Sequence, residues 1–318
     1  VGLRPGVSRR APGDRGGWRD ILSAIVLALP GSEPLGRRVS ELAECPFGLV
    51  ESRLFPDGES YLRIDAECAQ RSVVLVCTLD RPNEKLLPLV FLADAARELG
   101  ASRVGLVAPY LAYMRQDRRF QDGEAVTSRT FAGLLSRYVD WLATIDPHLH
   151  RYQSLTQIYA VPNRVVHAAP ALAAWIATHV DRAVVVGPDA ESAQWVKEVA
   201  DRARAPYVVM RKTRRSDRVV EVSAPDMAPY RMCTPVVVDD IVSSAQTMVE
   251  TVKCLVAAGL RAPVCVGVHA LFSDAAEQAL REAGAATSVP HPTNLIDIVP
   301  LLIPAIHELV EGRQDDPR

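Results

Sequence analysis

The stretch VVVDDIVSSAQTM, residues 236–248, decides the fold class and points to a ligand. It opens with three consecutive valines, an apolar β-branched run typical of a strand buried in a sheet. Asp239 and Asp240 follow directly, and a turn of small residues at 243–245 leads into a helical pattern. Ligands of open parallel sheets bind beyond the carboxyl ends of the strands. We therefore expect the two acids and the turn to face a binding site.

The chemistry of this segment indicates a phosphorylated sugar. A turn of small residues at a helix N-terminus offers free N–H groups and the positive end of the helix dipole, which suits a phosphate. Two carboxylates beside the turn suit a sugar diol or a Mg²⁺-bound polyphosphate better than a bare phosphate, which they would repel. The alternative is a solvated loop between strand and helix that binds no ligand.

The same alternation of strand and helix signals recurs along the chain. It is the signature of βαβ units and of a doubly wound, mainly parallel α/β sheet. The predicted strands cover residues 24–29, 73–78, 104–108, 141–145, 183–186, 207–210, 236–238, 264–270 and 287–289. The predicted helices between them include residues 86–99, 128–137, 190–200 and 245–258.

Length and composition fit two domains of ordinary size. The chain has 318 residues, of which 48% are hydrophobic and 23% charged, as in soluble globular proteins. A net charge of -2 argues against nucleic acid as a partner. No apolar run approaches the ~20 residues needed to cross a membrane. Six cysteines without metal-binding spacing indicate reduced thiols and a cytoplasmic location.

The composition also divides the chain. Residues 1–20 are rich in Gly, Pro and Arg, and we expect them to form a disordered extension. A proline- and alanine-containing stretch at 162–171 marks the boundary between two α/β halves. We therefore predict an N-terminal domain at 21–163 and a C-terminal domain at 164–298.

The segment at 239–247 resembles the ribose-phosphate loop of type I phosphoribosyltransferases and, more closely, that of the ribose-phosphate diphosphokinases, or PRPP synthetases. The usual pattern is two acids, two further residues, Asp or Ser, Thr, a small residue, Gly and Thr. The resemblance implies that ribose 5-phosphate is bound by Asp239, Asp240, Ser243, Ser244, Ala245, Gln246 and Thr247. Gln246 departs from the pattern, because a glycine that tolerates positive φ and close approach of the phosphate is expected there.

Two further stretches resemble segments with which this family holds ATP. FPDGE at 55–59 matches a Phe-x-Asp-Gly-Glu loop and is otherwise an ordinary turn. PYLAYMRQDR at 109–118 matches a Pro-Tyr…Arg-Gln-Asp-Arg motif and is otherwise a solvated basic loop. The resemblance implies ATP contacts from Phe55, Asp57, Glu59, Arg115, Gln116 and Asp117. In this family the first loop reaches a neighbouring subunit, which implies a homo-oligomer built from dimers, up to a hexamer.

Two polar segments that follow predicted strands imply the cation. DPHLH at 146–150 and GPDA at 187–190 match family motifs near Mg²⁺. By this resemblance His148 and Asp189 bind Mg²⁺, and His148 also lies near the ATP phosphates. His150 is expected at the surface, since no Cys or acid at zinc spacing accompanies the two histidines.

The basic run RKTRRSDR at 211–218 is the predicted catalytic segment. A run of charge is usually a solvated face, and a nucleic-acid patch is a second alternative. The run resembles the mobile catalytic loop of the family, which begins with Lys-x-Arg. Lys212 and Arg214 would therefore offset charge on the phosphate in transfer.

The matches follow the family's order over residues 21–306 and predict a ribose-phosphate diphosphokinase with two phosphoribosyltransferase-like domains. Such an enzyme transfers the β,γ-diphosphoryl group of Mg-ATP to O1 of ribose 5-phosphate, giving PRPP and AMP. The stretch FQDGEAVTS at 120–128 resembles the archaeal-like type. The resemblance further implies that residues 299–310 join the N-terminal domain. Because of Gln246, a diphosphokinase with a different ribosyl or pentose phosphate acceptor stays open, as does a non-catalytic regulatory paralogue.

Overall fold

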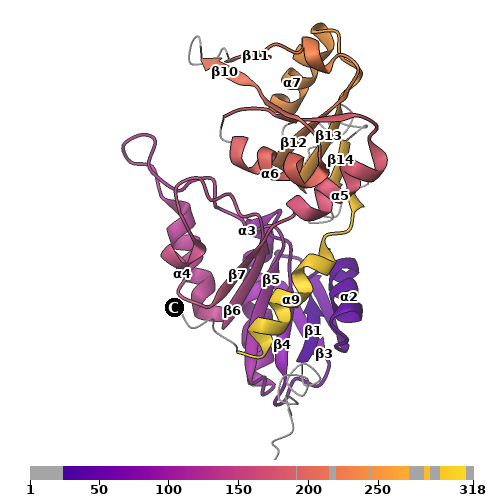
Figure 1. Ribbon diagram of the computed structural model, residues 1–318. Coiled ribbons are helices and arrows are strands. Elements are labelled where there is room, and N and C mark those ends of the chain that lie inside the picture. Colours follow the sequence, from indigo (N-terminus) through magenta and orange to yellow (C-terminus); the bar gives the residue numbers. More distant parts are fainter. Residues whose placement is uncertain are drawn as a thin grey trace, which may run out of the picture.

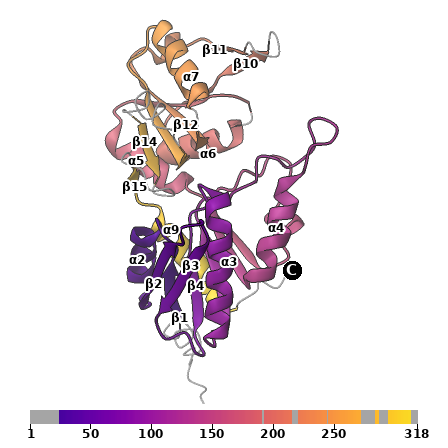
Figure 2. The same cartoon turned by 180° about the vertical axis from the view of Figure 1, so that it is seen from behind.

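A computed structural model describes residues 24–190, 192–214, 220–243, 245–271, 283–286 and 294–312 of the chain. Two lobes lie one beyond the other, and each is built on its own sheet with helices on both faces (Figures 1 and 2). The predicted α/β class with two sheets is therefore found. The extension predicted at 1–20 and the strand predicted at 287–289 lie outside the described residues.

The N-terminal sheet has seven strands in the order β3-β2-β1-β4-β5-β6-β7. They are β1 (Ala24–Ala28), β2 (Phe47–Leu54), β3 (Ser60–Asp65), β4 (Ser72–Val76), β5 (Arg103–Ala108), β6 (Trp141–Ile145) and β7 (Asn163–Val166). All neighbours pair in parallel except β2 and β3, which form an antiparallel hairpin. The inner strands β1, β4 and β6 are buried throughout, because helices cover both faces of the sheet.

Four helices cover the N-terminal sheet. One face packs against α2 (Glu33–Leu42) and α9 (Val299–Val310), and the other packs against α3 (Pro82–Glu98) and α4 (Thr127–Tyr138). The short 3₁₀ helix η1 (Leu155–Gln157) follows β6. No helix within the described parts of the chain is long and apolar enough to span a membrane.

Within the described residues, the C-terminal sheet has six parallel strands in the order β15-β14-β13-β12-β8-β9. They are β8 (Ala183–Gly187), β9 (Tyr207–Val209), β12 (Thr234–Val242), β13 (Val264–Ala270), β14 (Ala283–Ala286) and β15 (Asn294–Ile296). The helices are α5 (Ala169–His179) and α6 (Ala193–Ala203) on one face, α7 (Gln246–Ala257) on the other, and the 3₁₀ helix η2 (Ala228–Tyr230). A separate antiparallel pair, β10 (Arg211–Arg214) and β11 (Val220–Ser223), projects from this lobe (Figure 1).

Pattern reading located the buried strands and missed the exposed ones. The strands predicted at 141–145 and 264–270 match β6 and β13 at both ends. The hairpin β2–β3 and the short β7 were not predicted, because their residues are mostly exposed or only half-buried, and a strand pattern is therefore weak there. β12 is longer than the predicted 236–238, since its pairing with β13 continues to Val242.

Helix α9 carries the chain back from the C-terminal lobe to the N-terminal sheet (Figure 1). Nη1 of Arg103 on β5 donates to the carbonyl oxygens of Leu309 at 3.0 Å and Val310 at 3.3 Å, at the C-terminal end of α9. Cations are favoured at that end of a helix dipole. The apolar core under α9 is continuous from β1 to β12, so both lobes share it.

The boundary predicted between residues 163 and 164 falls inside β7. All four residues of β7 pair with β6 and therefore belong to the N-terminal sheet. We propose that the N-terminal domain extends to Val166, with α9 as a further part of it. The C-terminal domain then begins with the segment that leads into α5.

Gly105 in β5 is the position at which a single methyl group should damage the core most. A Cβ built there would lie 1.8 Å from the ring of Trp141, which is fully buried on β6. We expect Gly105→Ala to lower the free energy of unfolding by about 3 kcal/mol, the upper end of typical overpacking costs. Urea unfolding measures this change.

Gly133→Ala provides the matched control for this substitution. Gly133 lies inside α4, and its added Cβ meets nothing within 4 Å. Alanine there should raise the free energy of unfolding by about 0.5–1 kcal/mol, because it favours the helix. Equal effects of the two substitutions would contradict the packing described at Gly105.

Candidate active site

A cleft of about 480 Å³ lies between the two lobes. Its walls come from the carboxyl ends of β7 and β12, from the segments that follow β5, β6, β7, β8 and β12, and from the start of α6. Ligands of parallel sheets bind at these strand ends. Its volume suits a small-molecule ligand. The residues predicted from sequence that line it are Arg115, His148, Asp189, Asp239, Asp240, Ser243 and Thr247.

The two acids of β12 form the floor of the cleft and face different partners. Oδ1 of Asp239 accepts from the Asp240 N–H at 3.0 Å, and Oδ1 of Asp240 accepts from the Ile241 N–H at 2.8 Å. Oδ2 of Asp240 lies 2.8 Å from Nδ1 of His148 in the other lobe. One oxygen of Asp240 is thus used to fix the side chain, and the other points toward the N-terminal lobe.

The electrostatics of this pair favour a bound cation or hydroxyl donor. Burial raises the pKa of Asp239 well above its usual range, and the charges of Asp240 and Asp189 raise it further. Burial also acts to raise the pKa of Asp240, but the hydrogen bond and charge of His148 outweigh it, so the pKa of Asp240 is lowered. Three acids close together in a half-buried cleft fit a divalent cation by their donor set, because Mg²⁺ prefers oxygen ligands.

The turn between β12 and α7 explains why Gln246 is accommodated. Ala245 precedes α7 and has φ of 57°, in the left-handed region, whereas Gln246 is the first residue of the helix. The backbone conformation that favours glycine therefore falls at Ala245, one position before the expected glycine. The side chain of Gln246 is exposed. Ser244 lies outside the described residues.

Arg115 links the two lobes. It follows β5, and its Nη1 donates to Oγ of Ser243 at 3.5 Å, the outer limit of a hydrogen bond. Arg115 is exposed at the rim of the cleft, and its guanidinium offers several donors in one plane. This side chain can therefore reach an anionic ligand that occupies the cleft.

The neighbouring predicted residues Gln116 and Asp117 point into the protein. Oε1 of Gln116 accepts from Oγ1 of Thr127 at 3.2 Å. Asp117 is buried, and both of its carboxylate oxygens accept from Nη1 of Arg151, at 2.9 and 3.1 Å. In this chain these two side chains hold the loop after β5 and do not line the cleft.

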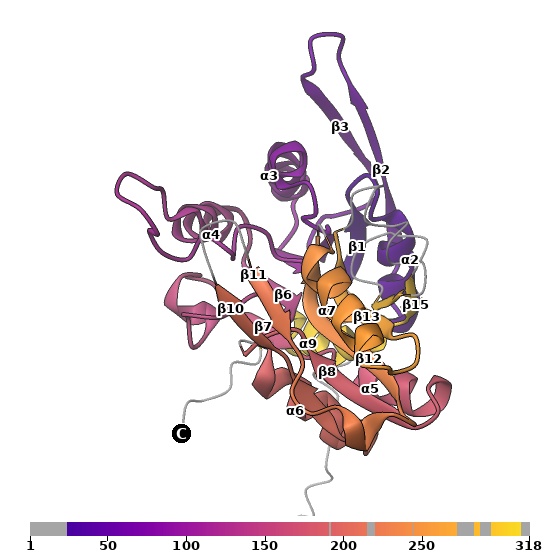
Figure 3. The ribbon, with the colours of Figure 1, turned by 90° about the horizontal axis from the view of Figure 1, so that it is seen from above.

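Phe55, Asp57 and Glu59 are also away from the cleft. They form the tip of the β2–β3 hairpin, which projects from the N-terminal lobe (Figure 3). All three are exposed. Among the residues that the structure describes, the ring of Phe55 contacts only its own hairpin, and the guanidinium of Arg53 lies 4.7 Å from its centroid. Within one chain, the hairpin tip and the cleft are therefore separate surfaces.

The predicted catalytic residues Lys212 and Arg214 lie on β10. Lys212 pairs with Val222 and Arg214 with Val220 of β11. The backbone thus forms a two-stranded extension of the C-terminal lobe (Figure 1). The side chains of both residues lie outside the described part of the structure, as do residues 215–219.

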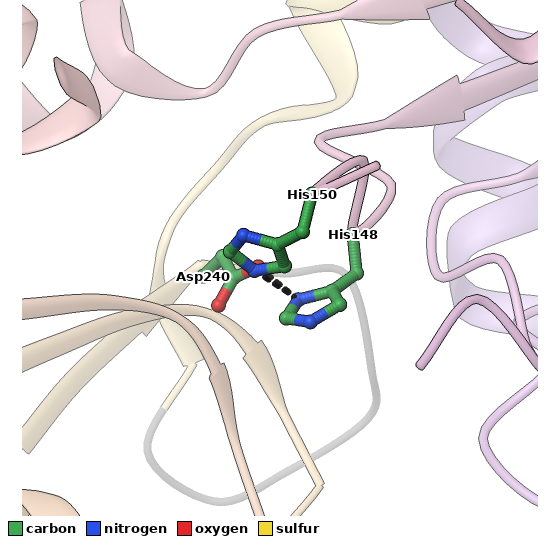
Figure 4. A group of neighbouring side chains, drawn as sticks. All are labelled: His148, His150 and Asp240. Carbon is green, nitrogen blue, oxygen red and sulfur yellow. Dashed lines mark hydrogen bonds and ion pairs between the residues drawn. The ribbon is translucent and has the colours of Figure 1, made fainter. Parts of the chain in front are cut away.

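Several residues of the cleft were missed by sequence reasoning. His150 was expected at the surface; it is exposed, yet its Nε2 lies 3.2 Å from Nδ1 of His148 (Figure 4). Asp240, which completes this group, is 92 residues from His148 in sequence, so no spacing rule could join them. His167, Ser192, Trp195 and Glu198 also line the cleft and carry no motif.

Asp146 fixes the loop that presents the two histidines. Its Oδ1 lies 2.8 Å from Nδ1 of His167, and its Oδ2 accepts from the Ala168 N–H at 2.8 Å. The buried His269 of β13 donates from Nε2 to the Ile145 carbonyl at 2.9 Å. Burial lowers the pKa of His269, although the charges of Asp146 and Asp240 act to raise it. These contacts tie the β6–β7 loop to the C-terminal lobe.

Together, the two sheets and the interlobe cleft define a protein of two phosphoribosyltransferase-like domains. A crystal structure of phosphoribosylpyrophosphate synthetase from Mycobacterium smegmatis has the same fold, with a TM-score of 0.78 and 23% identity. The match covers 92% of this chain and 100% of that chain. The class of fold predicted from the sequence is confirmed.

Sequence comparisons identify the family. Residues 24–138 match the N-terminal domain of ribose phosphate pyrophosphokinase, and residues 154–298 match the phosphoribosyl transferase domain. The ribose-phosphate pyrophosphokinase of Methanopyrus kandleri is 34% identical over 293 residues, 90% of this chain and 99% of that protein. That of Saccharolobus solfataricus is 30% identical over 277 residues, 86% of this chain and 94% of that protein. The chain belongs to the ribose-phosphate pyrophosphokinase family, which confirms the predicted family, enzyme class and likeness to archaeal members.

The His167–Asp146 contact should make stability depend on pH. The hydrogen bond to Asp146 raises the pKa of His167, although burial acts to lower it. A raised folded-state pKa stabilises the protein below the unfolded value of about 6.5, and this stabilisation is lost as pH rises through the folded value. We expect His167→Gln to lower the free energy of unfolding at about pH 5.5 but not at about pH 8.5.

The effect should stay below about 1 kcal/mol, because the side chain of His167 is 62% exposed and the pair is screened by solvent. Urea unfolding at both pH values measures it. His179→Gln is the control, because His179 is an exposed histidine on α5. A larger effect of His167→Gln at high pH than at low pH would contradict the assignment.

Proposed function

We propose that this chain transfers the β,γ-diphosphoryl group of Mg-ATP to O1 of ribose 5-phosphate, giving PRPP and AMP. The observation that carries the proposal is the composition of the cleft. Acids and a phosphate-binding turn from the C-terminal lobe face an arginine and a histidine from the N-terminal lobe. A sugar phosphate on one wall and a nucleoside triphosphate on the other would then meet in the space between the lobes.

The C-terminal wall suits ribose 5-phosphate. The N-terminus of α7 presents N–H groups and a positive dipole end to a phosphate, and Ser243 and Thr247 line the same turn. Asp239 and Asp240, just before the turn, would accept hydrogen bonds from the 2- and 3-hydroxyls. Bound in this way, the sugar would direct O1 toward the N-terminal lobe.

The N-terminal wall suits the phosphates of ATP. Arg115 would donate to phosphate oxygens, and His148 lies beside the path between the two substrates. His148 and Asp189 would hold Mg²⁺, a fit supported by the acids that crowd this cleft and raise the pKa of Asp239. Bound there, Mg²⁺ would neutralise phosphate charge.

Transfer needs alignment and charge stabilisation, with no covalent intermediate on the protein. The O1–H bond and the bond from the β-phosphorus to the α-phosphate oxygen break, the O1–β-phosphorus bond forms, AMP leaves, and the O1 proton passes to water. Lys212 and Arg214 on β10 would approach the cleft from the β10–β11 pair and offset the charge that develops during transfer. Holding both substrates in one cleft supplies the remaining advantage.

Adenine binding is proposed to require a second copy of the chain. Phe55, Asp57 and Glu59 are exposed at the hairpin tip and remote from the cleft of their own chain. Phe55 would stack on the base, and the two acids would accept from its amino group. The protein is therefore proposed to act as a homo-oligomer based on a dimer. A cytoplasmic location is also proposed, supported by the six cysteines, none of which forms a disulfide.

The direct test incubates the protein with Mg-ATP, with and without ribose 5-phosphate, and identifies the products by mass spectrometry. AMP and PRPP should form only when both substrates are present. Absence of sugar-dependent AMP would refute the proposal. A parallel screen of other pentose phosphates then separates a changed acceptor from a chain that only binds ATP.

The assignment of β10 predicts a large kinetic effect. Lys212→Ala should lower kcat by roughly 10²-fold, the usual cost of losing one preorganised transition-state donor. Steady-state AMP release measures it. Lys197→Ala is the control, because Lys197 is exposed on α6 and pairs with Asp201 on the same helix. If the two variants turned over equally fast, Lys212 would have no catalytic role.

The geometry of the phosphate turn predicts that replacing Gln246 with the glycine usual in the family changes the binding of ribose 5-phosphate little. Gln246 is helical and its side chain is exposed, so Gln246→Gly should change the KM for ribose 5-phosphate by less than about threefold. Initial rates at varied sugar concentration measure this. A tenfold fall in KM would instead show that the glutamine side chain obstructs the phosphate.

A further inference from the structure

His148, His150 and Asp240 converge on one point of the cleft (Figure 4). Nδ1 of His148 lies 2.8 Å from Oδ2 of Asp240 and 3.2 Å from Nε2 of His150. One ligand atom from each residue lies within 4.8 Å of the others. The two imidazole rings, 3.8 Å apart between centroids, meet edge to face beside the carboxylate.

The separations of His148 from the other two residues are close to those in the coordination shell of a transition-metal ion. Two ligand atoms about 2.1 Å from one ion are about 3.0 Å apart at a right angle and about 3.4 Å apart at the tetrahedral angle. The His–His distance of 3.2 Å falls between these values, and the His–Asp distance of 2.8 Å is slightly below them. Small side-chain rotations would therefore admit an ion at the centre.

Hydrogen bonding alone satisfies the group incompletely. A neutral His148 that donates its Nδ1 proton to Asp240 has no lone pair left on that atom to accept from His150. One proton could serve both contacts only as a bifurcated hydrogen bond, whereas a cation accepts lone pairs from all three side chains at once. The three side chains are therefore better suited to coordinating a metal ion than to hydrogen bonding with one another.

We propose that His148, His150 and Asp240 form a binding site for a divalent transition-metal ion such as Zn²⁺ or Co²⁺. Two imidazoles and one carboxylate are typical ligands of such ions, whereas Mg²⁺ prefers an all-oxygen shell. The site shares His148 with the proposed Mg²⁺ position and differs from it in using His150 and Asp240 in place of Asp189. The ion would bridge the two lobes, because the histidines follow β6 and the carboxylate belongs to β12.

The bound ion would compete with ribose 5-phosphate for Asp240, an inference that rests on the proposed function. Oδ1 of Asp240 accepts from the Ile241 N–H, so Oδ2 is the oxygen that faces the cleft. The ion and a ribose hydroxyl would both use it. A bound transition-metal ion would therefore raise the apparent KM for ribose 5-phosphate and act as an inhibitor.

The first experiment measures binding with Co²⁺ alone, without substrates, by its visible d–d absorption bands. We expect one ion per chain in the wild type and in His179→Gln, the control with an exposed histidine outside the cleft. His150→Gln should weaken binding at least about tenfold, as for loss of a ligand. Mg²⁺, which would share His148, should displace Co²⁺ only weakly even in excess, because imidazole nitrogens favour transition-metal ions. His150 is exposed, so its replacement leaves the core intact.

Equal Co²⁺ affinity of the wild type and His150→Gln, or no d–d bands in the wild type, would overturn the site. The second experiment adds Zn²⁺ to the AMP-release assay and compares the KM for ribose 5-phosphate. An increase in KM in the wild type that is weaker in His150→Gln supports competition, and an effect on kcat alone refutes it. A chain that forms no AMP would refute the proposed function, while the spectroscopic result would still decide the metal site.

Discussion

The return of α9 to the N-terminal sheet is the constraint on which the arrangement of the lobes depends. The helix follows the C-terminal sheet in sequence, yet it packs beside α2 on the sheet formed by the first strands. Its far end is held by Arg103, which donates to two of its last carbonyl groups. Because the apolar core continues from β1 under α9 to β12, the two lobes cannot separate without exposing buried surface. The cleft between them, and every cross-lobe contact in it, follows from that packing.

Electrostatic balance within the cleft is the second organising feature. The C-terminal wall supplies acids, one of which is buried enough for its pKa to be raised, and the N-terminal wall supplies an arginine and two histidines. The contact between His148 and Asp240 joins these opposite sets. Such a cleft suits ligands that carry both hydroxyls and phosphates, because acids bind the former and cations the latter. A simple anion site would have no use for Asp239 and Asp240.

The sequence predicted those elements of the fold whose bounds are marked by a local pattern of residues. β6 and β13 are buried on both faces and bounded by turns, so their apolar runs marked both ends. The hairpin β2–β3 is half-exposed and charged, and its pairing depends on a partner strand that no local pattern reveals. The same limit applies to the cleft. The motifs located Asp240 and His148 separately, but the role of His150 depends on Asp240, which only the folded chain brings near. The φ angle of Ala245, which makes Gln246 tolerable, is likewise fixed by the turn as a whole.

The position of α9 in the sequence also means that the N-terminal sheet is synthesised well before the helix that covers one of its faces. Strands β5, β6 and β7 are complete once Val166 has been made, but the helix that covers one of their faces begins only at Val299. At the usual speed of translation, roughly 5–20 residues per second, the intervening ~130 residues take roughly 7–27 seconds. During that interval the nascent N-terminal sheet presents an uncovered apolar face to its surroundings. Non-native contacts at that face are therefore a hazard until α9 emerges.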